Sequence, residues 1–282
     1  MIIGVSPAYF LSKFGEHFSP KQVMGEIPIL KGMGFDCFQL EITHREHLAD
    51  WDERQLELLH ETCSRNDVHV SQLVAHFWID NSSDSLRVLR GYPLAEVHKL
   101  LDLASRLPGC DVLTVPFGKF RLQENSILTK AIFHQIEDRL VDWMRLLCDM
   151  AQGRNLRIAL ELQPGAIVAG IGGMRQMLAR LPSVDNLGYN FDTGHAHAFR
   201  DVLETIPSRL GSKIFGTHLC DNDGMSNLSL TPGDGTIEWV QVLRSLQSND
   251  YHGSFDLEII CPPEQIPENY SKGRQLVLRI MQ

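Results

Sequence analysis

Six ionisable side chains stand at or near the ends of short apolar segments rich in β-forming residues: Glu41, His76, Glu161, Asp192, His218 and Glu258. In the clearest case, the stretch 187–195, an apolar run stops at an acid, a small polar residue and a glycine before His195. A side chain at the end of a buried strand is held rigidly and can converge with others on a ligand. Two glutamates, an aspartate and a histidine that converged would need a neutralising partner, because burying several like charges is costly.

A divalent cation is the natural partner for such a group. Carboxylate oxygens and imidazole nitrogens together suit Mn²⁺, Mg²⁺, Co²⁺ or Zn²⁺. The six cysteines, at positions 37, 63, 110, 148, 220 and 261, have no Cys-x-x-Cys pairing, which argues against a structural zinc site. The expected cofactor is therefore a divalent metal ion at a mixed oxygen and nitrogen site.

The elements that must position these side chains alternate regularly along the chain. We expect eight strands at 2–6, 36–42, 68–75, 111–115, 156–162, 187–195, 213–219 and 254–260, each followed by a segment with helical spacing of apolar residues. The long segment 77–91 is expected to be a loop. Eight such units without a Pro/Ser-rich linker predict a single-domain α/β protein over residues 1–282, a (β/α)₈ TIM barrel. In these barrels the chemistry lies at the carboxyl ends of the strands, so the six side chains should meet at one mouth.

Composition narrows the class of partner. The net charge of −9 at pH 7 works against binding to phosphate backbones or anionic lipid. No apolar run approaches the roughly 20 residues that cross a bilayer, and no charged start with an apolar core precedes the first strand. We expect a cytoplasmic protein that binds a small molecule, not nucleic acid or a membrane.

Five segments together resemble a known family. They are ALEL at 159–162, FDTGH at 191–195, THLCDNDG at 217–224, PGDGTIEW at 232–239 and LE at 257–258. On these motifs the chain is similar to the xylose-isomerase-like TIM barrels, which include sugar and sugar-phosphate epimerases and isomerases, inosose dehydratases and the AP endonucleases of family 2. The resemblance covers nearly the whole chain and implies a possible homo-oligomer.

The resemblance implies a role for each motif residue. Glu161, Asp192, His218 and Glu258 would bind one metal ion, manganese among the candidates, and His195 would contact the substrate. The metal would act as a Lewis acid on a carbonyl and its neighbouring hydroxyl and stabilise an enediolate. Glu161 and Glu258 would be the catalytic acid and base: returning the proton to the opposite face of the same carbon epimerises the sugar, whereas returning it to the adjacent carbon isomerises it.

Four further residues are candidates for the substrate pocket. Glu41 and His76 are expected to line it, with a buried polar pair as the alternative reading. Trp78 is expected to pack against the apolar face of a sugar. Asp221 follows His218 closely and is expected either to orient it or to bind a substrate hydroxyl.

The leading prediction is a metal-dependent epimerase or isomerase of a sugar or sugar phosphate. A metal-dependent lyase or dehydratase on a polyol or keto-sugar would use the same ligands. An AP endonuclease is less expected, because Pro116 stands at the end of the fourth strand and Asn227 and Ser229 occupy loop positions where the nucleases would have metal ligands. A barrel that only binds a sugar is the remaining alternative.

Overall fold

The computed structural model describes residues 1–122 and 127–282. Eight parallel strands in this part of the chain form one sheet, in the order β7-β6-β5-β4-β3-β2-β1-β8. The prediction of a single-chain α/β TIM barrel is confirmed. The strands are β1 (Ile2–Val5), β2 (Cys37–Glu41), β3 (His69–Val74), β4 (Val112–Phe117), β5 (Arg157–Leu162), β6 (Leu187–Asp192), β7 (Ile214–His218) and β8 (Ser254–Leu257).

The sheet closes between β7 and β8 through a thin seam. Leu219 and Leu257 form an isolated parallel bridge just past the end of β7. Below this bridge the Thr217 hydroxyl takes the place of ladder bonds: it donates to the Ser254 carbonyl at 2.9 Å and accepts from the Asp256 N–H at 3.2 Å. The junction between β7 and β8 is thus held by two backbone hydrogen bonds of Leu219, to Asp256 and from Glu258, together with the Thr217 side chain.

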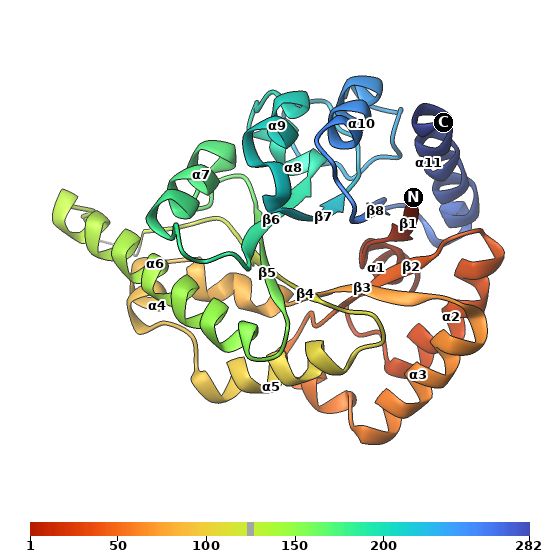
Figure 1. Ribbon diagram of the computed structural model, residues 1–282, viewed down its shortest axis with the longest axis horizontal. Coiled ribbons are helices and arrows are strands. Elements are labelled where there is room, and N and C mark those ends of the chain that lie inside the picture. Colours follow the sequence, from red (N-terminus) through yellow and green to blue (C-terminus); the bar gives the residue numbers. More distant parts are fainter. Residues whose placement is uncertain (123–126) are drawn as a thin grey trace.

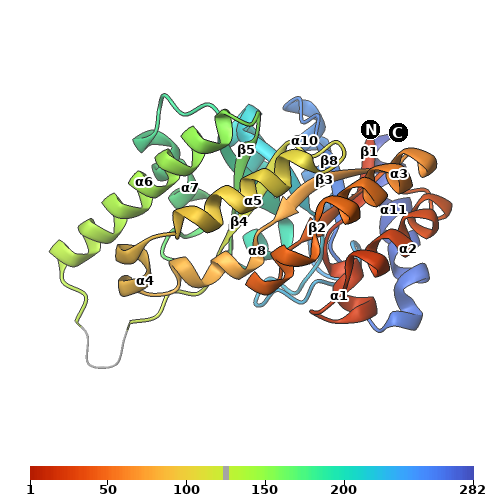
Figure 2. The same ribbon diagram turned by 90° about the horizontal axis from the view of Figure 1, so that it is seen from below.

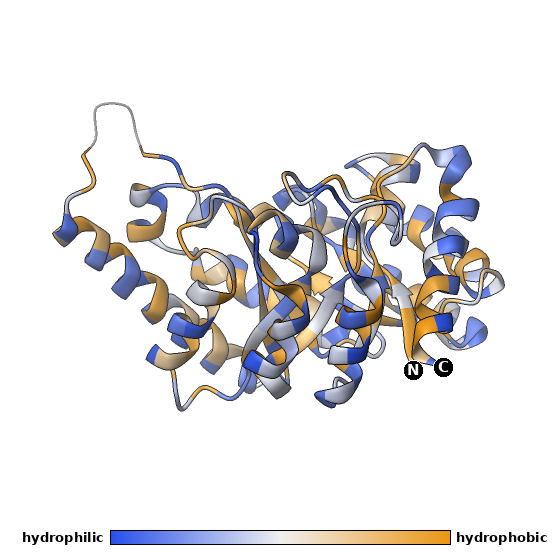
Figure 3. Cartoon of the chain, turned by 90° about the horizontal axis from the view of Figure 1, so that it is seen from above, coloured by the Kyte–Doolittle hydropathy of each residue, from blue (hydrophilic) through white to orange (hydrophobic). Residues whose placement is uncertain are grey.

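Helices surround the strands (Figure 1). Figure 3 shows hydrophilic and hydrophobic residues alternating along them, as expected when one face of each helix packs on the barrel. No helix in the described ranges is long and apolar enough to cross a membrane. The helices are α1 (Ala8–Phe14), α2 (Pro20–Gly32), α3 (Glu53–Asn66), α4 (Ser85–Arg90), α5 (Leu94–Arg106), α6 (Lys130–Gln152), α7 (Gly170–Arg180), α8 (Thr193–Ala198), α9 (Ile206–Leu210), α10 (Trp239–Ser248) and α11 (Ile266–Met281).

The fourth strand continues two residues beyond its expected end and includes Pro116. Thr114 accepts a hydrogen bond from Ala75 on the β3 side, and Pro116, two residues on, faces the same side. There β3 has already ended and a 3₁₀ helix, η2 (His76–Ser82), has begun. The missing N–H of proline therefore leaves no ladder bond unmade.

Other departures from the expected elements occur in the connections between strands. The segment 77–91, expected to be a loop, contains most of η2 and the short helix α4. The sixth strand ends at Asp192 rather than continuing to residue 195, because the Asp192 carboxylate accepts from the His195 N–H at 2.8 Å and so caps α8. The N- and C-termini lie side by side in both views of the ribbon, next to β1 and α11 (Figures 1 and 2).

Candidate metal centre

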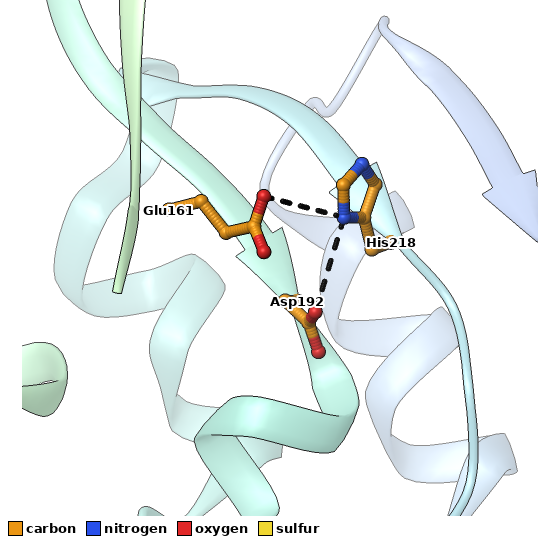
Figure 4. A group of neighbouring side chains, drawn as sticks. All are labelled: Glu161, Asp192 and His218. Atoms are coloured by element: carbon orange, nitrogen blue, oxygen red, sulfur yellow. Dashed lines mark ion pairs between the residues drawn. The ribbon is translucent and has the colours of Figure 1, made fainter. Parts of the chain in front are cut away.

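Four consecutive strands bring the four predicted ligands to one mouth of the barrel. Glu161, Asp192 and His218 lie at the carboxyl ends of β5, β6 and β7, and Glu258 directly follows β8. Figure 4 shows Glu161, Asp192 and His218 pointing toward one another. The Nδ1 atom of His218 lies 3.6 Å from Glu161 Oε2, 3.8 Å from Asp192 Oδ2 and 2.8 Å from Glu258 Oε2.

The hydrogen bonding of this group fits a metal ion. Asp192 Oδ2, His218 Nδ1 and Glu258 Oε2 are buried atoms without a hydrogen-bond partner. His218 Nδ1 and Glu258 Oε2 are close, but they are not aligned as donor and acceptor. Such unpaired buried atoms are costly unless something else satisfies them. His218 Nδ1 lies 3.6 Å from Glu161 Oε2 and 3.8 Å from Asp192 Oδ2, below the separation of about 4.2 Å that a cation with bonds of about 2.1 Å can span.

The pKa values of these residues and of His195 also fit a bound cation. Burial disfavours the charged imidazole of His195, but Asp192 and Glu161 outweigh burial and raise its pKa to about 9. Burial also opposes the charge on His218, and Glu258 and Glu161 raise the pKa of His218 well above its usual value. Burial would raise the pKa of Asp192, yet His195 and His218 lower it to about 2. The carboxylates therefore create a field that draws positive charge, which protons supply here and a divalent cation could supply instead.

His195 lies beside the metal ligands rather than apart from them. Its Nε2 atom is 3.3 Å from Glu161 Oε1 and 3.4 Å from Asp192 Oδ2. Its ring also lines the cavity at the mouth, while its backbone N–H is held by Asp192. His195 therefore lies next to Glu161 and Asp192 and also faces the cavity at the mouth.

Two residues that were not predicted from the sequence hold the ring of His218 in place at its Nε2 atom. His218 Nε2 lies within hydrogen-bond distance of Gln39 Oε1, at 2.7 Å, and Gln39 Nε2 donates to Asp256 Oδ2 at 2.9 Å. Both are fully buried on β2 and β8. Strand alternation was the available signal, since Gln39 and Asp256 are each two residues before a predicted site residue and so share its face.

The cavity at the mouth has a volume of about 240 Å³. Its polar lining includes three of the predicted metal ligands, Glu161, His218 and Glu258, and also Glu16, Glu41, Thr43, His76, Gln163, His195 and Asn227. Burial, reinforced by Glu161 and Glu258, raises the pKa of Glu41 to about 8, so this acid is a hydrogen-bond donor at neutral pH. His76 Nδ1 lies 3.8 Å from Glu41 Oε1. The structure thus brings Glu41 and His76 into the same cavity as the metal centre.

Trp78 and Asp221 lie outside the lining of this cavity. Trp78 is fully buried, and its indole N–H donates to Glu96 at 2.9 Å. Asp221 holds the loop that follows β7: its carboxylate accepts from the Gly233 N–H at 2.9 Å, the Ile237 N–H at 3.1 Å and the Trp239 indole at 2.7 Å. Trp78 therefore takes part in packing, and Asp221 stabilises the loop that follows β7.

Cys220 is a buried neighbour of the centre that sequence reasoning did not single out. Its Sγ atom lies 3.8 Å from Asp192 Oδ1 and 3.6 Å from Asn227 Oδ1. Burial, with Asp192 and Glu258 nearby, raises the pKa of the thiol well above its usual value. Cys220, Asp192 and Glu258 also offer ligand atoms within 4.8 Å of one another, and the raised pKa of the thiol favours its neutral form in the metal-free protein.

Comparison with known proteins gives a family match over most of the chain. The model of the xylose isomerase-like TIM barrel family matches residues 27–280. An inosose isomerase from Halalkalibacterium halodurans is 24% identical over 241 residues, which cover 81% of this chain and 79% of that protein. The chain spans only 57% and 44% of the lengths of two further relatives, uncharacterized proteins from Sinorhizobium fredii and Methanocaldococcus jannaschii, at 24% and 28% identity.

Solved structures share the fold over the whole chain. The crystal structure of 3-keto-D-glucoside 4-epimerase from E. coli has a TM-score of 0.75 at 18% identity and covers 99% of both chains. The structure of the IOLI protein with a bound zinc atom has a TM-score of 0.73 at 18% identity and covers 99% of this chain and 98% of that one. At these identities the likeness is one of fold.

Proposed function

Because the chain belongs to the xylose isomerase-like TIM barrel family, we propose that it is a sugar epimerase or isomerase that works with one divalent metal ion. The observation that carries the proposal is the convergence of two glutamates, an aspartate and a histidine whose buried ligand atoms include three without a hydrogen-bond partner. The inosose isomerase relative and the 3-keto-D-glucoside epimerase fold support the same class of reaction.

Glu161, Asp192, His218 and Glu258 would hold the metal ion, which can be Mn²⁺, Mg²⁺, Co²⁺ or Zn²⁺. When bound, the ion supplies Lewis acidity toward the oxygens of a carbonyl and its neighbouring hydroxyl. A carboxylate has two oxygens, so Glu161 and Glu258 can each bind the ion through one and exchange a proton through the other.

Proton transfer by the two glutamates would carry the reaction. One glutamate removes the proton from the carbon beside the carbonyl, and the electron pair of that C–H bond moves toward the carbonyl oxygen, which gives an enediolate. The other glutamate delivers a proton to the opposite face of the same carbon and inverts it; delivery to the neighbouring carbon moves the carbonyl instead. His195, 3.3 Å from Glu161, is placed to donate a hydrogen bond to the substrate oxygen.

The lining of the cavity favours an unphosphorylated sugar. Among the described residues it contains no lysine or arginine to pair with a phosphate, and it adds Glu16 and Glu41 to the metal ligands. Glu41 and His76, which line the same cavity as the proposed ligands, are proposed to bind substrate hydroxyls. A free sugar meets these requirements without an unpaired anion.

The test is turnover of ketoses and keto-sugars in D₂O with excess divalent metal. The wild-type protein should incorporate deuterium at the carbon beside the carbonyl, and chelation should stop it. Glu161→Gln and Glu258→Gln should each lower kcat by roughly 10²- to 10⁴-fold at saturating metal, whereas Glu264→Gln, an exposed glutamate after β8, should not. Full activity in either site variant would refute the acid and base roles, and loss of water from the substrate would identify a lyase.

A further inference from the structure

Gln39 has one amide end facing a metal ligand and the other facing acceptors. Its Oε1 atom lies 2.7 Å from His218 Nε2. Its Nε2 atom donates to Asp256 Oδ2 at 2.9 Å and is 3.4 Å from the Thr217 carbonyl oxygen. The backbone carbonyl can only accept, and Asp256 already accepts from several donors, so the NH₂ end must face them. The amide oxygen of Gln39 is thereby directed at His218.

This orientation determines which nitrogen of His218 carries hydrogen. An amide oxygen only accepts, so His218 Nε2 must be the donor. The lone pair of the neutral ring is then on Nδ1, the atom that faces Glu161, Asp192 and Glu258 without a hydrogen-bond partner. We propose that Gln39 and Asp256 are positioning residues that set the tautomer and direction of His218 for metal binding through Nδ1. The inference rests on the metal centre proposed above and not on the sugar chemistry.

Asp256 is itself held in place, so the chain of contacts from Asp256 through Gln39 to His218 has little freedom to reorganise. Its carboxylate accepts from the Ser254 hydroxyl at 2.5 Å and from the Ser71 hydroxyl at 3.3 Å. On its other side is Gly4, where even a Cβ atom would come within 2.1 Å of Asp256 Oδ1. Gln39 and Asp256 are both fully buried. A metal-binding histidine oriented by such a buried partner binds its metal more tightly, and loss of the partner typically costs roughly 10- to 100-fold in affinity.

The barrel interior also provides a matched control residue. Gln72 on β3 is a buried glutamine that accepts from the Thr114 hydroxyl at 2.5 Å and donates to Asn190 at 3.3 Å. It has no hydrogen bond to a proposed metal ligand. A role in packing alone would make Gln39 and Gln72 equivalent, whereas a positioning role would separate them.

The experiment is calorimetric titration of the metal-free, full-length protein with Zn²⁺. Gln39→Leu should weaken zinc binding by roughly 10- to 100-fold, and Gln72→Leu should leave it within about threefold of wild type. Gln39→Glu should also weaken binding, because it sets a second carboxylate against Asp256. The double variant Gln39→Glu/Asp256→Asn restores one donor facing one acceptor between residues 39 and 256 and between residue 39 and His218, and gives up only the long 3.4 Å contact with the Thr217 carbonyl, so it should recover most of the affinity.

A measurement on the unmodified protein covers the case in which a variant does not fold. Long-range ¹H–¹⁵N NMR of the zinc-loaded wild type should show His218 bound through Nδ1 with a proton on Nε2. Binding through Nε2, equal zinc affinity in Gln39→Leu and wild type, equal losses in Gln39→Leu and Gln72→Leu, or no recovery in the double variant would each overturn the positioning role. A wild-type protein that binds no divalent metal would instead overturn the metal centre, and this inference with it.

Discussion

At the scale of single residues, the mouth of the barrel is defined by acids that cannot all be charged. Glu41 shows this most directly, because it is buried near Glu161 and Glu258 and its pKa is raised to about 8. A carboxylic acid kept neutral at pH 7 donates a hydrogen bond, so Glu41 can bind a sugar hydroxyl or carbonyl without adding charge. The other acids at the mouth, Glu161, Asp192 and Glu258, are the proposed ligands of the cation.

The raised pKa of Glu41 predicts how stability depends on pH in the metal-free protein. The folded state holds the proton up to about pH 8, whereas the unfolded chain releases it near pH 4.5. Stability should therefore fall as pH rises from 4.5 to 8. Glu41→Gln should lack this fall and be more stable than wild type at pH 8, by up to about 5 kcal/mol.

Urea unfolding of both proteins across that range is the measurement. His195, with a pKa raised to about 9, adds stability below pH 6.5 that is lost as pH rises through 9. The contribution of His195 is the same in wild type and in Glu41→Gln, so the difference between their curves of stability against pH reports the ionisation of Glu41. Parallel curves for wild type and Glu41→Gln would show that Glu41 ionises normally.

The convergence of the four proposed metal ligands was easier to predict from the sequence than the contacts of the residues behind them. Glu161, Asp192, His218 and Glu258 follow apolar strands and stand out by type, and the structure brings them together. Gln39 and Asp256 lie inside strands, where alternation places them on the same face as Glu41 and Glu258 but does not show which side chains they contact. The contacts of Gln39 join residues far apart in sequence, 179 residues from His218 and 217 from Asp256, which the closed barrel brings together.

At the scale of elements, the eight strands were predictable because apolar runs of five to seven residues between turn signals are typical of buried parallel strands. The short helices α1, α4 and α8 were not predicted. Each has at most seven residues, which is too short to show helical periodicity, and α1 has no side-chain cap. Tertiary packing rather than local preference determines such elements.

The seam between β7 and β8 gives a prediction at this scale. Thr217→Val keeps the shape of the side chain but removes the hydroxyl that bonds to Ser254 and Asp256. It should lower the free energy of unfolding by about 1–3 kcal/mol, because the Asp256 N–H is left unpaired in a buried seam. Thr217→Ser retains the hydroxyl and should lose much less. Chemical denaturation of the three proteins tests this, and equal stability of the valine and serine variants would contradict it.

At the scale of the whole molecule, the proposed metal centre would link the ends of four adjacent strands, β5 to β8. A ligand that binds only the folded state stabilises it by about 2.7 kcal/mol at a concentration of 100 times its Kd. Divalent metal at that concentration should therefore raise the Tm by about 5 °C in a protein of 282 residues. Asp192→Asn should lose most of that increase.

Differential scanning calorimetry with chelator and with increasing metal is the measurement. The stabilisation should grow with metal concentration and reverse when chelator is added. A Tm that does not change with Mn²⁺, Mg²⁺, Co²⁺ or Zn²⁺ would mean that the four strands are not joined by a cation.

The position of the ligands along the chain has a consequence for biosynthesis. All four proposed ligands lie between residues 161 and 258, and Gln39, which contacts His218, belongs to β2. A nascent polypeptide that has left the ribosome only as far as β7 would have three of the four ligands and an open sheet. We therefore expect metal capture to wait until β8 has been synthesised and docked, so that uptake of the ion itself distinguishes finished chains from aborted ones.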